Sequence, residues 1–405
     1  MTEMTPFKEL ISYEEALKKI LKTIKPMQRI ETISIGKASD RVLAEDIVAQ
    51  MSLPPFDRAA MDGYAVKAED TFGATQRKPK SLRVRGVLHA GQTSSEILTK
   101  DECIQIATGS PIPKGADAVV MVEFTHKENG NVNIARPVYP GANISPRGED
   151  IEEGKMILEA GQQLSPARIG ALAALGRKEV GVYQKPRITV VPTGTEIQEV
   201  GSSLKEGHIY DVNSYTLSSI AAKSGGIPKK YKTVLDTPPD IEEAIKKMLT
   251  TDMIVFSGGS SVGERDLLVN VIEELGNILF HGIQIKPGKP TLFATIEEKP
   301  VFGMPGYPTS CLLNAYLFLV PGIRQMARLP PRIPITKRLP LAERVVSSTG
   351  RTQFLPVKIK EEEAYPVFKQ SGAITSMTEA DGYIILPINV DIAEKNQKFN
   401  VFLFD

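Results

Sequence analysis

The stretch that decides the fold of this chain is Met253-Ile254-Val255-Phe256-Ser257-Gly258-Gly259-Ser260-Ser261-Val262-Gly263-Glu264-Arg265-Asp266. Its apolar start, 253–256, predicts a buried strand, and residues 267–275 predict a helix. Between them, three glycines within six residues free the backbone to turn its N–H groups toward a ligand. A strand, a glycine-rich turn and a helix in this order are typical of an anion site at the carboxyl edge of an α/β sheet.

Two carboxylates, Glu264 and Asp266, end this turn. They repel a bare phosphate, but they suit a metal ion that stands between them and an oxyanion. We therefore expect a site for a phosphorylated ligand and a divalent cation.

Polar clusters follow several predicted strands of the same region. Strands and helices alternate between residues 185 and 329, with strands expected at 187–192, 231–235, 253–256 and 277–280, and this alternation predicts a doubly wound parallel sheet. Ligands of such sheets bind outside the carboxyl ends of the strands. The clusters are Thr193-Gly194-Thr195-Glu196, Asp236, Ser257 through Asp266, and Pro305-Gly306.

Lys286 and Lys289 flank a Pro-Gly turn, so both ammonium groups can face one anion. Two lysines in such a loop, taken alone, are more often solvated surface groups. Beside three loops of the phosphate-binding type, we favour their role as ligands of an anion.

The rest of the chain predicts further domains, because 405 residues exceed one compact core. Amphipathic helices expected at 12–24 and 165–175 indicate an N-terminal domain, and short alternating runs at 65–140 and after 335 indicate β-rich domains. The expected boundaries are 1–53 plus 142–184 for a discontinuous N-terminal domain, 54–141 for a β-rich inserted domain, 185–329 for the α/β domain and 330–405 for a C-terminal β-barrel-like domain.

The loop 52–64 is a further site candidate. It combines a double proline with Asp57 and an Asp62-Gly63 turn and has little amphipathic pattern. Loops that contain several charged or polar side chains and little pattern of buried apolar residues often carry functional residues. The alternative is a domain-entry turn with surface charge, which has equal weight for Asp57 and less for Asp62. The turn-dense segment around Thr108, by its spacing alone, favours a hairpin connection.

Composition excludes several classes of function. With 49 basic and 48 acidic residues the net charge is +1, which gives no reason to expect nucleic acid or an anionic membrane as a partner. Cys103 and Cys311 lie far apart and the four histidines are scattered, which favours a reduced, cytoplasmic protein without structural zinc. The longest apolar run, 311–320, is too short to span a bilayer.

The sequence contains no GxxxxGK[ST] loop, and no histidine lies within a motif. Carboxylates, lysines and glycine loops suit metal-assisted transfer at phosphate or oxyanion centres. Such chemistry works by positioning and charge neutralisation.

Taken together, the motifs resemble those of one family. Residues 54–66, PPFDRAAMDGYAV, resemble the PPFDxSAMDGYAV signature of the molybdopterin molybdenumtransferases, the MoeA and gephyrin E-domain family. The resemblance covers nearly the whole chain, and the set of motifs is specific although each motif alone is not. Further matches, in the family's order, are 115–120 with Glu123, 148–151, 257–266, 286–290, 305–306, 350–351 and 370–376.

The resemblance implies an elongated homodimer of four-domain subunits whose active site is shared between the subunits. It implies insertion of molybdate into adenylylated molybdopterin with Mg²⁺, which releases AMP and molybdenum cofactor. A molybdopterin adenylyltransferase is the pathway partner that it implies.

The resemblance also implies a set of site residues. Catalytic contributors would be Asp62, Thr108 and Asp150 from the second domain and Glu196, Asp236, Asp266, Lys286 and Lys289 from the α/β domain. Glu196, Asp236 and Asp266 would hold Mg²⁺, and the lysines would neutralise molybdate or phosphate. The substrate would be bound by Thr193, Gly194, Ser257, Gly258, Gly259, Ser260, Pro305, Gly306, Arg351 and Ser376.

Two departures from the family pattern matter for the site. Thr195 stands where the family usually has Asp, and Tyr307 stands where it usually has Asn. The alternatives to molybdate insertion are a tungstate-inserting paralogue, an adenylyltransferase that acts on molybdopterin, and a gephyrin-like scaffold that binds a partner peptide. Whether Glu264 is functional or structural stays open.

Overall fold

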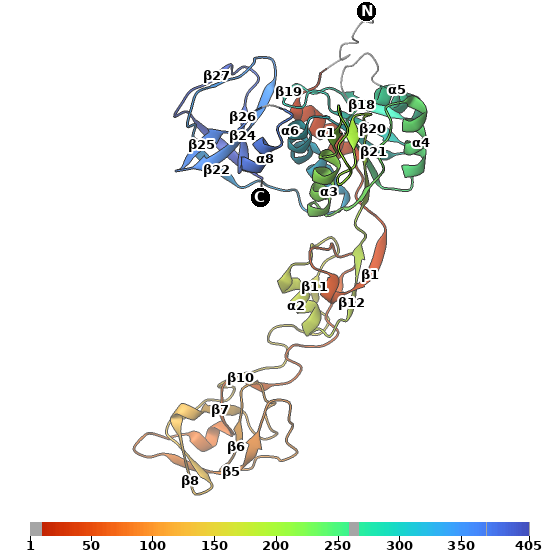
Figure 1. Ribbon diagram of the computed structural model, residues 1–405. Coiled ribbons are helices and arrows are strands. Elements are labelled where there is room, and N and C mark those ends of the chain that lie inside the picture. The colour runs from red at the N-terminus through yellow and green to blue at the C-terminus, as the bar shows by residue number, and fades with distance from the viewer. Residues whose placement is uncertain (1–9, 259–266, 370, 405) are drawn as a thin grey trace, which may run out of the picture. The chain divides into compact units, whose positions relative to one another are not determined.

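The computed structural model describes residues 10–258, 267–369 and 371–404 (Figure 1). The chain divides into two compact units. Unit 1 comprises Met1–Glu31, Asp40–Val42 and Val182–Asp405, and unit 2 comprises Thr32–Ser39 and Leu43–Gly181. Each unit has hydrophobic clusters of its own. The four finer domain boundaries stay a prediction.

The centre of unit 1 is a six-stranded sheet with the strand order β16-β13-β17-β21-β20-β18. The first four strands are parallel, and β20 and β18 run antiparallel to their neighbours. The bounds are β13 (Arg187–Pro192), β16 (Ile227–Lys230), β17 (Met253–Ser257), β18 (Asn277–His281), β20 (Leu292–Ile296) and β21 (Lys299–Met304).

Two details of the predicted sheet are wrong. The sheet is not wholly parallel, because β20 and β21 are joined by only Glu297 and Glu298, both at positive φ. Such a link makes a hairpin and is too short for a crossover. The strand expected at 231–235 lies instead at 227–230, at the end of the strand order. An edge strand tolerates proline and lysine, which conceal it in the sequence.

Helices cover both faces of this sheet (Figure 1). Ile188, Val190 and Phe302 face one core, and Ile254 and Phe256 face the other. Neighbouring residues of a strand thus enter opposite cores, as in sheets buried on both faces. On the first face are α1 (Tyr13–Thr23), α3 (Asn213–Lys223), α6 (Pro308–Asn314) and α7 (Val320–Met326), and on the second are α4 (Pro238–Met248) and α5 (Leu267–Leu275).

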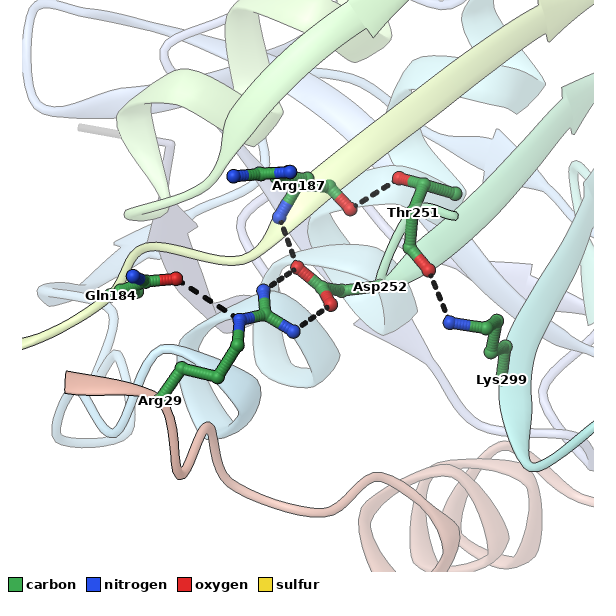
Figure 2. A network of polar contacts seen from close by, with 6 residues as sticks. All are labelled: Arg29, Gln184, Arg187, Thr251, Asp252 and Lys299. Carbon is green, nitrogen blue, oxygen red and sulfur yellow. Dashed lines mark hydrogen bonds and ion pairs between the residues drawn. The ribbon is translucent and has the colours of Figure 1, made fainter. Parts of the chain in front are cut away.

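A network of polar contacts holds the amino ends of the parallel strands (Figure 2). Asp252 accepts hydrogen bonds from Arg29 Nη1 at 2.8 Å, from Arg29 Nη2 at 2.7 Å and from the Arg187 backbone N–H at 2.8 Å. The Thr251 hydroxyl donates to the Arg187 carbonyl at 2.7 Å, and Lys299 Nζ donates to the Thr251 carbonyl at 2.8 Å. The network therefore joins the starts of β13, β17 and β21, and we call it the amino-edge network.

The amino-edge network also sets the charge of Asp252. Burial alone would raise the pKa of this carboxyl group. Hydrogen bonds from Arg29 and Arg187 outweigh the burial, so the pKa is lowered. Asp252 is therefore a satisfied, ionised structural group.

The C-terminal part of unit 1 is a second sheet with the order β19-β24-β26-β28-β22. Leu355, Val357 and Ile384 belong to its own core, whereas Phe354 and Phe404 join the core on the α1 side of the first sheet. The elements are β19 (Ile285–Lys286), β22 (Thr336–Pro340), β23 (Val345–Val346), β24 (Thr352–Lys360), β25 (Glu363–Pro366), β26 (Gly382–Leu386), β27 (Ile392–Ala393), β28 (Lys398–Leu403) and α8 (Thr375–Glu379), and the connection from β13 to α3 carries β14 (Ile197–Gln198) and β15 (Ile209–Tyr210).

Unit 2 is built on a six-stranded sheet with the order β7-β4-β6-β5-β9-β8. Tyr64, Val66, Val120 and Val132 belong to one of its clusters. The elements are β2 (Ile47–Val48), β3 (Arg58–Ala59), β4 (Gly63–Val66), β5 (Lys80–Leu88), β6 (Glu102–Ile106), β7 (Ala118–Met121), β8 (Thr125–Glu128), β9 (Asn131–Ile134), β10 (Ile144–Ser145), β11 (Met156–Leu158) and α2 (Pro166–Ala174), and β1 (Ile30–Ser34) pairs with β12 (Glu179–Tyr183). None of the helices in the described ranges combines the length and apolarity needed to cross a membrane.

Candidate active site

Three adjacent strands of unit 1 end side by side. Pro192 of β13 is paired with Ser257 of β17, and Ser257 is paired with Met304 of β21. The Thr193 N–H donates to the Ser257 carbonyl at 3.0 Å, and the Gly258 N–H donates to the Met304 carbonyl at 3.2 Å. The following loops therefore meet at one edge, which we call the carboxyl edge. It brings together Thr193, Gly194, Ser257, Gly258, Pro305 and Gly306.

The loops of the carboxyl edge approach one another through their backbones. Gly258 has a φ of +96°, and a Cβ at this position would lie 2.7 Å from the Thr193 carbonyl oxygen. A Cβ on Gly306 would lie 3.7 Å from the Gly258 Cα. Glycine at 258 is thus required for both conformation and space. The absence of side chains at Gly258 and Gly306 leaves room for a ligand to approach the backbone of this edge closely.

Two of the predicted metal ligands, Glu196 and Asp236, interact. Burial raises the pKa of Asp236, and the negative charge of Glu196 raises it further. Asp236 Oδ1 is buried and has no hydrogen-bond partner within the described residues. An unpaired carboxylate oxygen beside a second carboxylate fits a hard cation, and Mg²⁺ usually takes one or two carboxylates together with waters and substrate phosphates.

A larger ligand set is not found in the part of the chain that the structure describes. There, no group of three or more His, Cys, Asp or Glu residues could hold a metal ion. The third predicted ligand, Asp266, lies outside the described residues, as do Gly259, Ser260 and Glu264.

Lys286 and Lys289 lie on a loop that α6 holds in place. Asn314 Nδ2 donates to the Gly288 carbonyl at 2.9 Å and to Thr291 Oγ1 at 2.6 Å. A Cβ on Gly288, which has a φ of +98°, would lie 2.2 Å from Asn314 Nδ2. The turn between the lysines is therefore fitted to the amide of Asn314.

Sequence reasoning missed the two asparagines behind these loops, Asn213 and Asn314. Asn213 Nδ2 donates to the Gly306 carbonyl at 2.7 Å, much as Asn314 supports Gly288. In the described part of the chain, the buried Oδ1 of each has no hydrogen-bond partner. The only signal in the sequence was Asn314 as a polar residue inside the apolar run 311–320.

Arg351 and Ser376 lie in the C-terminal part of unit 1. Arg351 directly precedes β24, whose Gln353 is paired with Lys286. Ser376 is fully buried, and its hydroxyl accepts the Lys369 N–H at 3.1 Å. This hydroxyl therefore has a structural partner, and its predicted role toward the substrate stays a prediction.

In unit 2 the structure brings Asp62 and Thr108 together. Asp62 precedes β4 and Thr108 follows its paired strand β6. Asp62 Oδ1 accepts the Thr108 backbone N–H at 2.7 Å and its hydroxyl at 2.9 Å. The backbone hydrogen bond and then the side-chain hydrogen bond lower the pKa of Asp62. The pair is exposed, so an oriented carboxylate faces solvent.

Asp150 lies in another loop of unit 2. Its backbone N–H donates to the Leu53 carbonyl at 3.0 Å. With Lys155, Met156 and residues of α2, it lines a cavity of about 510 Å³. No hydrogen bond between Asp150 and Asp62 is found in the described residues.

Family models match three segments of the chain. They are the MoeA N-terminal region (domains I and II) over residues 11–176, a "Probable molybdopterin binding domain" over 189–325, and the MoeA C-terminal region (domain IV) over 338–404. The chain belongs to the MoeA family. The carboxyl edge and the lysine loop both lie within the middle match.

Individual relatives agree with this membership over nearly their whole length. A Methanocaldococcus jannaschii protein assigned to molybdopterin biosynthesis is 36% identical over 386 residues, which are 93% of this chain and 92% of that protein. The molybdopterin molybdenumtransferase of Staphylococcus aureus strain COL is 32% identical over 93% of this chain and 91% of its own length. The MoeA crystal structure from Pyrococcus horikoshii has a TM-score of 0.86 and 40% identity and covers 98% of this chain and 100% of its own.

These findings confirm two of the predictions from the sequence. The motif resemblance is confirmed, and so is the multi-domain class with its doubly wound α/β domain. As a member of this family, the chain is an enzyme of molybdenum cofactor biosynthesis.

Proposed function

We propose that this MoeA-family chain inserts molybdate into adenylylated molybdopterin in the presence of Mg²⁺ and releases AMP and molybdenum cofactor. The observation that carries the proposal is the carboxyl edge, where glycine backbone and two carboxylates lie at the same end of the sheet as the connection from β18 to β20, which carries both lysines. Packing alone requires none of these groups there. The names of the relatives supply the substrate class.

Each group of the edge has a role that follows from its charge. The glycine backbone at 258 and 306 would leave space for the phosphate part of the substrate to approach. Asp236 and Glu196, with Asp266, would hold Mg²⁺, which would neutralise phosphate charge as AMP leaves. Lys286 and Lys289 would neutralise molybdate as a substrate oxyanion. The chain's own contribution is positioning and fixed charge.

The test measures AMP release by the purified protein from adenylylated molybdopterin. The expected result is release that needs both Mg²⁺ and an oxyanion, with molybdate and tungstate in parallel reactions. Faster release with tungstate would favour the paralogue reading. Transfer of AMP from ATP to molybdopterin, without oxyanion-dependent release, would replace the proposal by the adenylyltransferase reading.

The resemblance further suggests that Asp62 and Thr108 act in a site shared within a homodimer. The hydrogen bonds from Thr108 support this role, because they orient an exposed carboxylate without neutralising its charge. Mixing inactive Asp62→Asn with inactive Asp236→Asn protein tests it. Random pairing of subunits would restore about a quarter of the wild-type activity. No recovery, with subunit exchange shown by mass, would place all these residues in one subunit.

A further inference from the structure

Tyr307 is an exposed aromatic residue at the carboxyl edge. It follows Pro305-Gly306 directly, and 68% of its surface is exposed. A large aromatic side chain contributes most to stability when it is buried. The exposed ring is therefore accessible to a ligand bound at the carboxyl edge.

The surroundings of Tyr307 hold its backbone in place. The preceding Gly306 carbonyl accepts from Asn213 Nδ2 at 2.7 Å. The Tyr307 carbonyl accepts the Cys311 N–H at 2.8 Å, in the first turn of α6. The backbone from which the ring projects is thus held by hydrogen bonds on both sides along the chain.

A glycine flanks the ring of Tyr307. A Cβ on Gly372 would lie 3.6 Å from Tyr307 Cδ1, so no side chain intervenes there. The loop of Gly372 is tied to α6, because Thr309 donates its N–H to the Ser371 carbonyl at 3.0 Å and its hydroxyl to the Ala373 carbonyl at 2.7 Å. Tyr307 therefore lies at the carboxyl edge with Gly372 beside its ring, and the segment 371–374 leads directly into α8, which carries another predicted site residue, Ser376.

The geometry points to Tyr307 as a stacking wall for a flat heteroaromatic ring of the substrate. This inference rests on the proposed function, whose substrate contains two such rings, the pterin and the adenine. Aromatic side chains bind such rings through their π-faces with little regard to the ring's identity. Tyr307 is thus a specificity-determining contact of the substrate.

The experiment measures the dissociation constants of molybdopterin and of AMP, separately, for the full-length protein and its variants. Tyr307→Phe keeps the ring and is expected to bind within about twofold of wild type. Tyr307→Asn and Tyr307→Leu lose the ring and are expected to bind one probe about tenfold more weakly. The probe that responds identifies the stacked ring. Tyr365→Asn, a half-buried tyrosine of β25 whose hydroxyl bonds to Glu363, is the matched control and is expected to leave both constants unchanged.

A spectroscopic measurement separates stacking from a structural role. Pterin fluorescence at saturation should be quenched by wild type and by Tyr307→Phe more strongly than by Tyr307→Leu if the pterin is the stacked ring. If Tyr307→Asn and Tyr307→Leu bound each probe with the same dissociation constant as wild type, the inference would be overturned and the proposed function would stand. A wild-type protein that binds neither probe would overturn the proposed function, and the inference with it.

Discussion

The two ends of the same parallel strands differ in how their polar groups are satisfied. At the amino edge, both carboxylate oxygens of Asp252 accept hydrogen bonds from Arg29 (Figure 2). At the carboxyl edge, Asp236, Asn213 and Asn314 each keep a buried oxygen that has no partner in the described residues. One sheet thus has a closed end and an open end.

The difference indicates which end of the sheet contributes to stability and which end is available for binding. Buried polar groups are nearly always paired, and an unpaired one costs about 1–3 kcal/mol. Three of the six such side-chain atoms in the described residues lie around the carboxyl edge, and we infer that a bound ligand there would satisfy them. Sites for ligands are commonly less stable than the scaffold that supports them. Substitutions at the two ends are therefore expected to affect different properties.

The largest expected effect on activity is that of Asp236→Asn. This change removes a negative charge from the predicted metal site while it preserves the shape of the side chain. We expect AMP release to fall by about a hundredfold or more, measured with saturating molybdate and Mg²⁺. Asp240→Asn, nearby on α4 and bonded to Thr237, is the matched control and should retain wild-type activity. Full activity in Asp236→Asn would remove this carboxylate from the site.

A smaller loss of activity is expected for Gly288→Ala. The added Cβ would meet Asn314 Nδ2 at 2.2 Å, and the residue would keep a φ of +98°. The lysine loop must shift, so activity should drop about tenfold, and the free energy of unfolding should fall by about 1–3 kcal/mol. Gly350→Ala is a control for the cost of the conformation alone, since Gly350 also has positive φ but a Cβ there would meet no atom within 4 Å. Equal effects of the two substitutions would show that the fit to Asn314 is unimportant.

At the amino edge, the expected effect is on stability. Asp252→Asn leaves Arg29 without its charged partner and removes strong acceptors for two guanidinium N–H groups. We expect the free energy of unfolding to fall by about 1–3 kcal/mol, measured by denaturant unfolding at neutral pH. Glu298→Gln removes the exposed partner of Lys25 and serves as a surface ion-pair control with an expected loss below about 1 kcal/mol. An unchanged stability in Asp252→Asn would show that the network adds nothing measurable.

The pH dependence of stability should also reflect the structural role of Asp252. The folded-state pKa of Asp252 is lowered, below an ordinary value of about 3.9. The contribution of Asp252 to the free energy of unfolding is therefore fully present at a pH above that ordinary pKa. It is lost as the pH falls through the lowered folded-state pKa. Between about pH 5 and pH 2, the wild type should lose stability more steeply than Asp252→Asn. Parallel curves for the two proteins would contradict the role of this carboxylate.

Local patterns were sufficient to predict the carboxyl edge. The apolar run 253–256 followed by glycine and serine predicted the end of β17, and equivalent loops followed β13 and β21. Parallel strands bring such loops together without any knowledge of side-chain contacts. The hydrogen bonds from Thr108 to Asp62 needed the pairing of β4 with β6. Asp62 stood in a recognisable motif, whereas the spacing around Thr108 favoured a hairpin connection.

Long-range contacts escaped prediction for a physical reason. Arg29 and Asp252 are 223 positions apart, and neither lies in a pattern that selects the other as its partner. Asn213 and Asn314 are single polar residues whose role depends on which carbonyl lies nearby in the fold. The strand 227–230 was hidden because its lysines and proline are compatible with an edge position alone.

The most direct test of the divided roles measures two quantities on the same preparations of Asp236→Asn and Asp252→Asn. They are the rate of AMP release and the free energy of unfolding at neutral pH. The account predicts that Asp236→Asn loses activity with its stability unchanged or raised, because a buried charge beside Glu196 is removed. Asp252→Asn should lose stability and keep activity within about twofold. If both variants lost activity and stability in parallel, the division between a structural amino edge and a functional carboxyl edge would be contradicted.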